Sequence, residues 1–412
     1  MLVTDMDCQM QAERSHIYVS PPKLVEPMRH RIKISFVIDL IETCTAGTES
    51  HLRSLIETLD RDEFDVEIIC LLPNPRTVAD SFPCHVHSVC TDNQPGNPVS
   101  RFLKLVSHLR RRRPHIVQTY FQEGNTLGLL AAGVARTPII IGTTRNSSLP
   151  GEIHHRILRQ VSGILADKWQ CNSKAVWDRE KNRLGMARSK LVILPNALDL
   201  TKFSPPDEER REQVRRSLGL DTRQPIIVSV ANPRPVKDVS TLIRAARHVK
   251  EQYPLVQFVV VGTGPMLETL QQEVCSAGLG DQVRFAGAQS DVTPFIAAAD
   301  ICVLTSLSEG SSNSVLEYMG MGIPSVLSDI PPNRELVSGL FFEPGNEKDL
   351  ARKIQTLLTD ASLRAQLRHE YVSAAEEHSS QKVFALVRGY YSKLADEIRR
   401  NSGDKAFRTA VG

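Results

Sequence analysis

Several features that mark common protein classes are scarce in this sequence. Aromatic residues make up only 5% of the 412 residues, the net charge is only +3, and no apolar run is long enough to cross a bilayer. Nucleic-acid-binding domains usually concentrate positive charge and carry aromatics for base stacking, and a membrane-spanning helix needs about 20 mostly apolar residues. The composition therefore argues against a nucleic-acid partner and against a transmembrane helix.

The eight cysteines are scattered, and no CxxC pair occurs among them. Several, such as Cys70 and Cys302, lie in apolar strand-like runs, so we interpret them as packed, reduced thiols. The N-terminus carries Asp5, Asp7 and Glu13 where a signal peptide would need a basic start and an apolar core. We expect a cytoplasmic protein, with peripheral contact at the inner face of a membrane left open.

Common catalytic motifs are also missing. The chain has no GxSxG, no GxxxxGK[ST], no HExxH and no Cys/His cluster, so we expect neither a cofactor nor a metal site. Asp5 and Asp7 match the metal-binding DxD motif. No strand precedes them, so we interpret the match as coincidence.

Apolar strand patterns alternate with helical patterns along most of the chain. One series runs from a strand at Ile34–Ile38 to one at Leu191–Leu194, and a second runs from Ile226–Val230 to Ser325–Ser328, with helices after it. Such alternation is typical of parallel sheets covered by helices. Prolines and mixed charges at Phe203–Arg216 predict a linker between the series. We therefore expect an α/β fold with two doubly wound Rossmann-like domains facing across a cleft, where such sheets bind ligands.

The breaks in the pattern give predicted boundaries. We expect a flexible tail at 1–31, an N-terminal domain at 32–204, a C-terminal domain at 205–383, a final helix at 384–400 and a second flexible tail at 401–412.

Two glutamates lie in and just after a loop of small polar residues in the second series of strands and helices. Glu309 follows the strand Ile301–Leu304, and Glu317 lies inside the next helix. A carboxylate accepts two parallel hydrogen bonds, so one glutamate could hold a sugar hydroxyl and the other a ribose diol. The small residues between them let ligand oxygens approach backbone N–H groups at a helix N-terminus; they are Gly310, Ser311, Ser312, Asn313, Ser314 and Val315.

A second loop carries two cations. Arg234 and Lys237 follow the strand Ile226–Val230, and together they could stabilise the charge on a departing nucleotide diphosphate. Gly262 and Gly264 follow another strand in a tight turn that lacks the third glycine of the dinucleotide fingerprint.

Two further features belong to the N-terminal half. Gly47 opens a helix after the first strand and could let backbone approach a donor across the cleft. The run Arg110–Arg113 ends a helix that also carries Leu103, and it could contact anionic lipid, although a solvated helix end is the more common role of such a run.

The order of these motifs resembles that of a known family. Glu309 and Glu317 form E-x7-E, and the stretch Pro195-Asn-Ala-Leu-Asp199, the Arg234-Pro-Val-Lys237 loop and the Gly262-Thr-Gly-Pro265 turn precede it in the expected order. Over residues 32 to about 398 the chain resembles the retaining GT-B glycosyltransferases of family 4, the group 1 enzymes of bacterial lipopolysaccharide, capsule and exopolysaccharide synthesis.

The resemblance implies roles for these residues. The C-terminal domain would bind a UDP-, GDP- or ADP-sugar, with Arg234 and Lys237 on the diphosphate, Glu309 on the transferred sugar and Glu317 on the ribose. The N-terminal domain would bind the acceptor, and the final helix would return to it.

The chain departs from the family pattern at several positions. Asn232 stands where the family often has an arginine, and the segment Glu335–Leu340 lacks residues that usually precede its glycine. Tyr120, and Thr144 with Arg145, stand where the family often has histidines near the sugar, so we expect these side chains to contact the acceptor or the sugar.

The leading hypothesis is a retaining, metal-independent transferase that moves a sugar from a nucleotide donor to a glycan, lipid-linked or small-molecule acceptor. The alternatives are a GT-B-fold nucleotide-sugar 2-epimerase and a non-catalytic nucleotide-sugar binder. Intact Glu309, Lys237 and Glu317 argue against the binder, and the Pro-Asn and E-x7-E motifs favour family 4 over the epimerase.

Overall fold

The computed structural model describes residues 31–41, 47–74, 79–90, 96–145 and 163–410, with side chains described as far as residue 401. The pair Asp5 and Asp7, and all but the last residue of the expected N-terminal tail, lie outside the described residues.

The first half of the chain forms a seven-stranded parallel sheet. Its strands are β1 (Ile32–Ile38), β2 (Phe64–Cys70), β3 (His85–Ser88), β4 (Ile116–Thr119), β5 (Ile139–Thr144), β6 (Lys168–Cys171) and β7 (Leu191–Ile193), in the order β3-β2-β1-β4-β5-β6-β7. Strand β6 has no apolar run, so the sequence did not predict it; its core residue is the fully buried Trp169.

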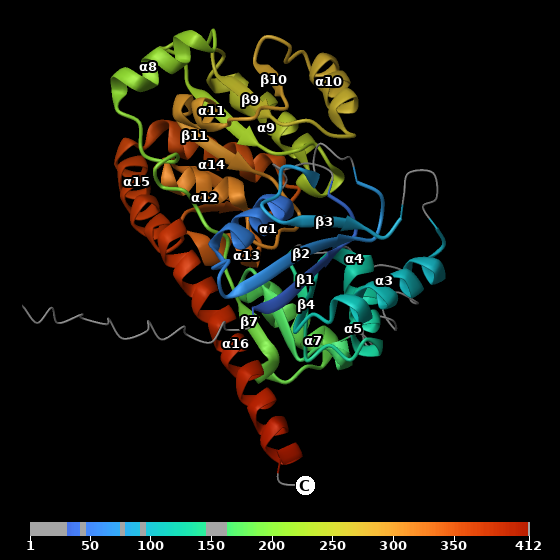
Figure 1. The fold of residues 1–412 in the computed structure, drawn as a ribbon. Helices are drawn as coiled ribbons and strands as arrows, with labels where there is room; N and C mark the ends of the chain where they lie inside the picture. Colours follow the sequence, from blue (N-terminus) through green and yellow to red (C-terminus); the bar gives the residue numbers. More distant parts are fainter. Residues whose placement is uncertain (1–30, 42–46, 75–78, 91–95, 146–162, 411–412) are drawn as a thin grey trace, which may run out of the picture.

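Helices cover both faces of this sheet (Figure 1). They are α1 (Gly47–Thr58), α3 (Pro98–Arg112), α4 (Phe121–Glu123), the π-helical turn η1 (Gly124–Gly128), α5 (Leu129–Val134) and α7 (Lys174–Leu184), and a short 3-10 turn η2 (Arg188–Lys190) precedes β7. Leu52 and Ile56 of α1 pack in one core cluster, while Leu105 of α3 and Leu129 of α5 pack in another. The sheet is buried on both faces, as parallel sheets require.

The second half forms a six-stranded sheet with the same winding. Its strands are β8 (Ile226–Val230), β9 (Gln257–Val261), β10 (Val283–Gly287), β11 (Ile301–Leu304), β12 (Ser325–Ser328) and β13 (Leu340–Phe342), in the order β10-β9-β8-β11-β12-β13. Its helical elements are α8 (Glu208–Ser217), the 3-10 turn η3 (Pro235–Lys237), α9 (Val239–Gln252), α10 (Leu267–Ser276), α11 (Thr293–Ala298), α12 (Asn313–Gly320), α13 (Pro331–Leu336), α14 (Glu347–Thr359) and α15 (Ala361–Glu376). The expected α/β fold of two doubly wound domains is confirmed.

Each sheet has one point where the direction of winding reverses. In the second sheet β8 and β11 lie side by side there, and Lys237 and Glu309 follow the carboxyl ends of these two strands. Ligands of doubly wound folds bind at this switch point, so the topology brings together the two loops that carried the strongest sequence signals.

The segment Phe203–Arg216, which the sequence predicts as the linker, contains most of helix α8. Asp207 caps this helix by accepting a hydrogen bond from the Arg210 amide at 2.8 Å. Two arginines of α8, Arg211 and Arg215, pair with Asp300. The helix carries almost no apolar periodicity, and its stability comes from the cap and from these tertiary ion pairs.

The long final helix α16 (Ser380–Ala410) runs alongside the N-terminal domain (Figure 1). Val387 and Tyr391 pack in the same core cluster as α1, the Tyr391 hydroxyl donates to Gln118 Oε1, and Arg399 pairs with Glu63 at 2.9 Å. The helix continues beyond the expected end near residue 400, since no proline interrupts 401–410 and Gly403 is the sole glycine there. The predicted domain limits themselves stay predictions.

Among the described residues, no helix is both long enough and apolar enough to cross a membrane.

Candidate active site

Lys237 and Glu309 face each other at the switch point of the C-terminal sheet. Lys237 Nζ lies 2.5 Å from Glu309 Oε1, and both side chains are largely buried. Two hydrogen bonds hold their loops together: Thr305 Oγ1 donates to the Lys237 carbonyl at 2.8 Å, and the Leu307 amide donates to the Val236 carbonyl at 2.8 Å. The structure therefore presents an ammonium and a carboxylate as a fixed pair.

Arg234 begins the same turn but differs in its surroundings. Its side chain is exposed, and its carbonyl accepts the Lys237 amide at 2.9 Å. An exposed guanidinium beside the largely buried Lys237 ammonium can reach toward an anion without giving up an internal ion pair.

Helix α12 starts directly after this pair, and strand β8 fixes its first turn. Ser312 is the N-cap and accepts from the Val315 amide at 3.4 Å, while Ser314 Oγ donates to the Val230 carbonyl at 2.8 Å. Tyr318 Oη accepts from the Val230 amide at 2.8 Å. The Ser314 hydroxyl thus bonds to the scaffold, and the Val315 amide bonds to the cap, which leaves the amides of Asn313 and Ser314 as the first-turn donors that a ligand could use.

Gly262 and Gly264 lie against the loop that leads to Lys237. A Cβ on Gly262 would stand 2.4 Å from the Ala231 carbonyl oxygen, and one on Gly264 would stand 2.4 Å from the Pro233 carbonyl oxygen. Gly262 also has φ +139°, which side chains rarely adopt. Both glycines allow two loops to touch, and this packing positions the cationic turn.

Glu317 lies in α12 in a less polar setting than Glu309. Burial raises its pKa to about 8, an effect that Lys202 opposes and Asp291 reinforces. Lys202 itself pairs with Asp291 at 3.1 Å. Sequence reasoning overlooked Lys202, which lies in the loop before the expected linker.

We expect the pKa of Glu317 to be visible in stability. Because its folded pKa lies above the ordinary value of 4.5, its contribution to the free energy of unfolding is complete below pH 4.5 and is lost as pH rises through about 8. In Glu317→Gln the side chain stays neutral, so the Tm of this variant relative to wild type should rise between pH 5 and pH 8.5. Thermal melts across this range test it, with exposed Glu251→Gln as control. Parallel Tm profiles for Glu317→Gln and wild type would contradict the burial argument.

The N-terminal domain touches the Glu309–Asn313 loop directly. A Cβ on Gly310 would stand 1.7 Å from the Arg145 carbonyl oxygen, and Ser173 Oγ donates to the Gly310 carbonyl at 2.6 Å. Asn196 Nδ2 donates to the Ser311 carbonyl at 3.1 Å and to Asn313 Oδ1 at 2.6 Å. A Cβ on Gly47, at the start of α1, would lie 3.4 Å from Asn313 Nδ2. The first turn of α12 is therefore a contact point between the domains, and Ser173, which the sequence did not single out, is part of it.

The three predicted contacts of the N-terminal domain have different surroundings. Tyr120 is 1% exposed, and its hydroxyl accepts from Gln118 Nε2 at 2.9 Å, so its side chain belongs to the core. Thr144 Oγ1 accepts from Trp169 Nε1 at 3.1 Å. Arg145 is 7% exposed and lies at the domain boundary. Arg145 reaches the Glu309–Asn313 loop through its backbone carbonyl, which lies against Gly310, while its side chain donates to Asn196.

One carboxylate that the sequence did not reveal follows strand β1 directly. Asp39 accepts from the amides of Gly124 at 2.6 Å and Glu123 at 3.2 Å, and burial raises its pKa to about 6. Its role as the acceptor for the last amide of α4 and the first amide of η1 explains its position. A carboxylate directly after a first apolar strand is the signal that could have found it.

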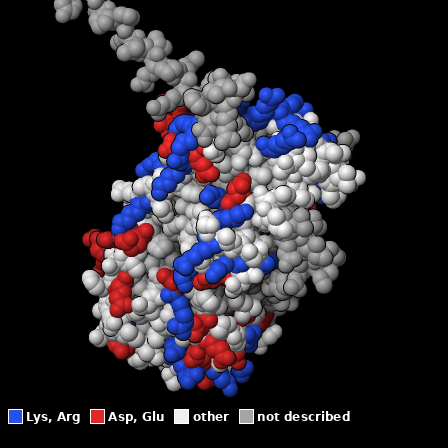
Figure 2. Space-filling view, turned by 90° about the horizontal axis from the view of Figure 1, so that it is seen from below, with Lys and Arg blue, Asp and Glu red and all other residues white. Residues whose placement is uncertain are grey.

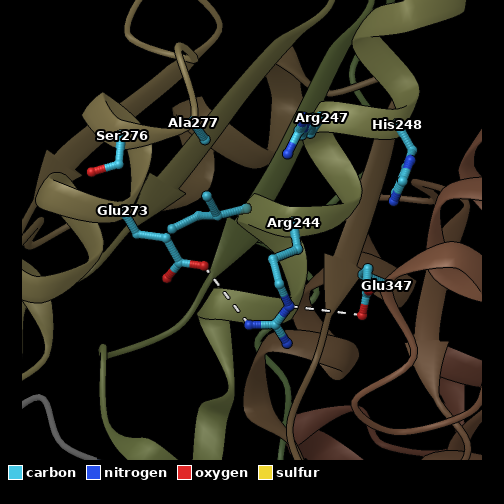
Figure 3. Close-up of a pocket in the computed structure, with 8 residues that line it drawn as sticks. Arg244, Arg247, His248, Glu273, Ser276, Ala277 and Glu347 are labelled. Atoms are coloured by element: carbon cyan, nitrogen blue, oxygen red, sulfur yellow. Dashed lines mark ion pairs between the residues drawn. The ribbon is translucent and has the colours of Figure 1, made fainter.

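Within the described ranges, no group of three or more His, Cys, Asp and Glu side chains is placed to hold a metal ion. A pocket of about 350 Å³ does lie elsewhere in the C-terminal domain, between α9, α10 and α14 (Figure 3). There Arg244 lies 3.7 Å from both Glu273 and Glu347, so its charge is already balanced within the pocket.

Family models match both halves of the chain. A model described as Glycosyltransferase Family 4 matches residues 45–202, and one described as Glycosyl transferases group 1 matches residues 210–378. The chain belongs to the group 1, family 4 glycosyltransferases.

Curated relatives of this glycosyltransferase span most of its length. It is 25% identical to an Escherichia coli UDP-Gal:alpha-D-GlcNAc-diphosphoundecaprenol alpha-1,3-galactosyltransferase, over 76% of this chain and 83% of the relative. It is 26% identical to a Campylobacter jejuni N,N'-diacetylbacillosaminyl-diphospho-undecaprenol alpha-1,3-N-acetylgalactosaminyltransferase, over 74% of this chain and 82% of the relative.

A solved structure of similar fold is that of Anabaena Alr3699/HepE in complex with UDP and glucose. It has a TM-score of 0.76 and 19% identity, and the match covers 88% of this chain and 100% of the other. The likeness confirms the GT-B fold of this glycosyltransferase.

Proposed function

We propose that this glycosyltransferase moves a sugar from a nucleotide-sugar donor to a lipid-linked acceptor, with retention of anomeric configuration and without a metal ion. The observation that carries the proposal is the Lys237–Glu309 pair beside the first turn of α12 at the switch point. Lys237 and Arg234 would neutralise the diphosphate, Glu309 would bind the transferred sugar, and Glu317 would bind the ribose.

The relatives guide the choice of substrates. The Escherichia coli enzyme is named for a UDP-sugar donor, both bacterial relatives are named for diphosphoundecaprenol-linked acceptors, and the Anabaena structure holds UDP. We therefore propose that the donor is a UDP-sugar rather than a GDP- or ADP-sugar. We propose that the acceptor is a polyprenyl diphosphate-linked sugar rather than a free glycan or a small molecule. Cell-surface polysaccharide or glycolipid synthesis is the corresponding setting.

A lipid-linked acceptor requires access to a membrane surface, and helix α3 offers a suitable face. Val99 and Leu103 are 66% and 61% exposed, and Arg110 and Arg111 at the end of the same helix are exposed as well. Figure 2 shows Lys and Arg side chains, with Asp and Glu side chains among them, on the side of the molecule seen from below. We propose peripheral contact with anionic lipid through α3. Equal sedimentation of Leu103→Ser/Arg110→Ser and wild type with anionic vesicles would contradict it.

The side chains expected near the sugar support the proposal of retention. Inversion needs a general base opposite the leaving nucleotide, and Tyr120, Thr144 and Arg145 are not bases near neutral pH. Burial and the charge of Arg145 lower the pKa of His51 well below 6.5, which makes this nearby histidine a weak proton acceptor. The departing diphosphate, held by Arg234 and Lys237, is then the best-placed base, on the face from which it leaves.

The test is a transfer reaction followed by NMR. With UDP-galactose or UDP-N-acetylgalactosamine and a polyprenyl diphosphate-linked N-acetyl sugar, we expect UDP release only when acceptor is present and an anomeric configuration equal to that of the donor. The rate should be unchanged in EDTA, because the cationic turn does the work of a metal ion. An inverted product, or loss of activity in EDTA that Mn²⁺ restores, would contradict the mechanism.

The same reaction distinguishes the proposed transferase from the two alternative functions. A 2-epimerase would convert the donor without an acceptor, and a non-catalytic binder would bind UDP but release none from UDP-sugar. Either result would replace the proposed transferase.

A further inference from the structure

Among the described residues, several buried polar side-chain atoms around the domain boundary have no hydrogen-bond partner. They are Arg145 Nη1, Asn172 Oδ1, Ser311 Oγ and His51 Nε2. Buried polar groups in folded proteins are almost always hydrogen bonded. Three of these residues contact the same loop: the Arg145 carbonyl lies against Gly310, the position of a Gly310 Cβ is 3.1 Å from Asn172 Oδ1, and Ser311 belongs to the loop itself. This concentration points to a group that is bound here during function.

Arg145 shows what charge that group has. Its Nη2 donates to Asn196 Oδ1 at 2.7 Å, while among the described residues no carboxylate pairs with it. Burial lowers the pKa of Arg145 to about 10. A buried cation without a counter-charge is costly, and proteins normally pair such groups. The missing partner of Arg145 is therefore an anion.

The contacts of Asn196 define where this anion would lie. Asn196 accepts from Arg145 and donates to Asn313 and the Ser311 carbonyl, so the guanidinium lies beside the first turn of α12. Gly47 places the start of α1 next to the same Asn313. Two helix N-termini, each carrying partial positive charge, thus converge near Arg145. On the other side of Gly310, Glu309 holds Lys237.

We infer that Arg145 binds a phosphate group of a substrate held between the two domains, through its free Nη1 and with Ser311 Oγ and His51 Nε2 beside it. The inference rests on the proposed function, which supplies two phosphate-bearing substrates: the nucleotide donor and the polyprenyl diphosphate acceptor. Arg145 then gives the N-terminal domain its own anion contact, in addition to those of Arg234 and Lys237 in the other domain. Substrate binding and domain contact would be coupled through this residue.

The experiment measures binding by calorimetry with two probes, UDP and inorganic pyrophosphate, and transfer kinetics with both substrates. The variants are Arg145→Gln, Arg145→Lys and Lys237→Ala, and exposed Arg216→Gln is the control. A charged hydrogen bond contributes about 1.5 to 3 kcal/mol, which corresponds to roughly a 10- to 150-fold change in affinity. The Tm of each free variant is recorded, and Arg145→Lys, which keeps the charge, separates anion binding from a loss of packing.

Weaker binding of UDP and pyrophosphate by Arg145→Gln, partly restored in Arg145→Lys, would assign the contact to the donor diphosphate. Unchanged binding of both probes with a raised KM for the lipid-linked acceptor would assign it to the acceptor. The inference would be overturned if Arg145→Gln kept the wild-type affinity for UDP and for pyrophosphate and the wild-type KM for donor and for acceptor. If Lys237→Ala alone loses UDP binding and Arg145→Gln also keeps a wild-type KM for the acceptor, the inference fails and the proposed function stands. If the wild-type protein transfers no sugar but binds pyrophosphate, and Arg145→Gln loses this binding, the proposed function fails and the anion site stands.

Discussion

Replacing Lys237 with alanine should lower kcat/KM by roughly 10- to 150-fold, because a charged hydrogen bond to the diphosphate contributes about 1.5 to 3 kcal/mol. The same change also leaves Glu309 without its partner at 2.5 Å. We expect a similar loss for Arg234→Ala, whose side chain is exposed and makes no contribution to the core. Steady-state kinetics with varied donor and acceptor measure both effects.

Lys348→Ala is the matched control, since this lysine is an exposed residue of α14. Its kinetics should equal those of wild type. The Tm of Lys237→Ala should show a folded protein at the assay temperature. A well-folded Lys237→Ala enzyme with unchanged kinetics would remove this turn from the active site and with it the proposed mechanism.

Gly310→Ala should reduce kcat/KM by about 100-fold. The new Cβ would stand 1.7 Å from the Arg145 carbonyl oxygen and 2.6 Å from its carbonyl carbon, so backbone on one side or the other has to move. Glu309 and the first turn of α12 move with this loop, and a displacement of about 1 Å in an active site can cost about 100-fold in rate. Kinetics of the variant measure the effect directly.

Gly389→Ala separates this steric effect from a general effect of adding a methyl group. Gly389 lies in α16, and nothing stands within 4 Å of its Cβ position. Alanine favours a helix over glycine by up to about 1 kcal/mol, so Gly389→Ala should keep full activity with an equal or higher Tm. Full activity in Gly310→Ala would mean that the contact between Gly310 and Arg145 is not part of the catalytic state.

Local sequence predicted the central strands well. Ile34–Ile38 and Ile226–Val230 are apolar runs buried on both faces, and such runs need little tertiary information to be recognised. Elements without such an apolar run were missed. Strand β6 has polar residues around Trp169, and α8 is charged along most of its length. Tertiary contacts, such as the pairing of Arg215 with Asp300, stabilise what propensity alone does not.

Local sequence patterns were enough to predict the family resemblance, the two doubly wound domains and the loops that carry Lys237 and Glu309. The carboxyl ends of parallel strands lie at one edge of a sheet. The order of strands and loops along the chain therefore predicts which loops meet there. Three other facts emerged from the folded structure alone: Tyr120 is a core residue bound to Gln118, burial raises the pKa of Glu317 to about 8, and Arg145 lies buried against Gly310. These facts depend on contacts between residues far apart in the chain, and desolvation and close packing arise only when such residues meet.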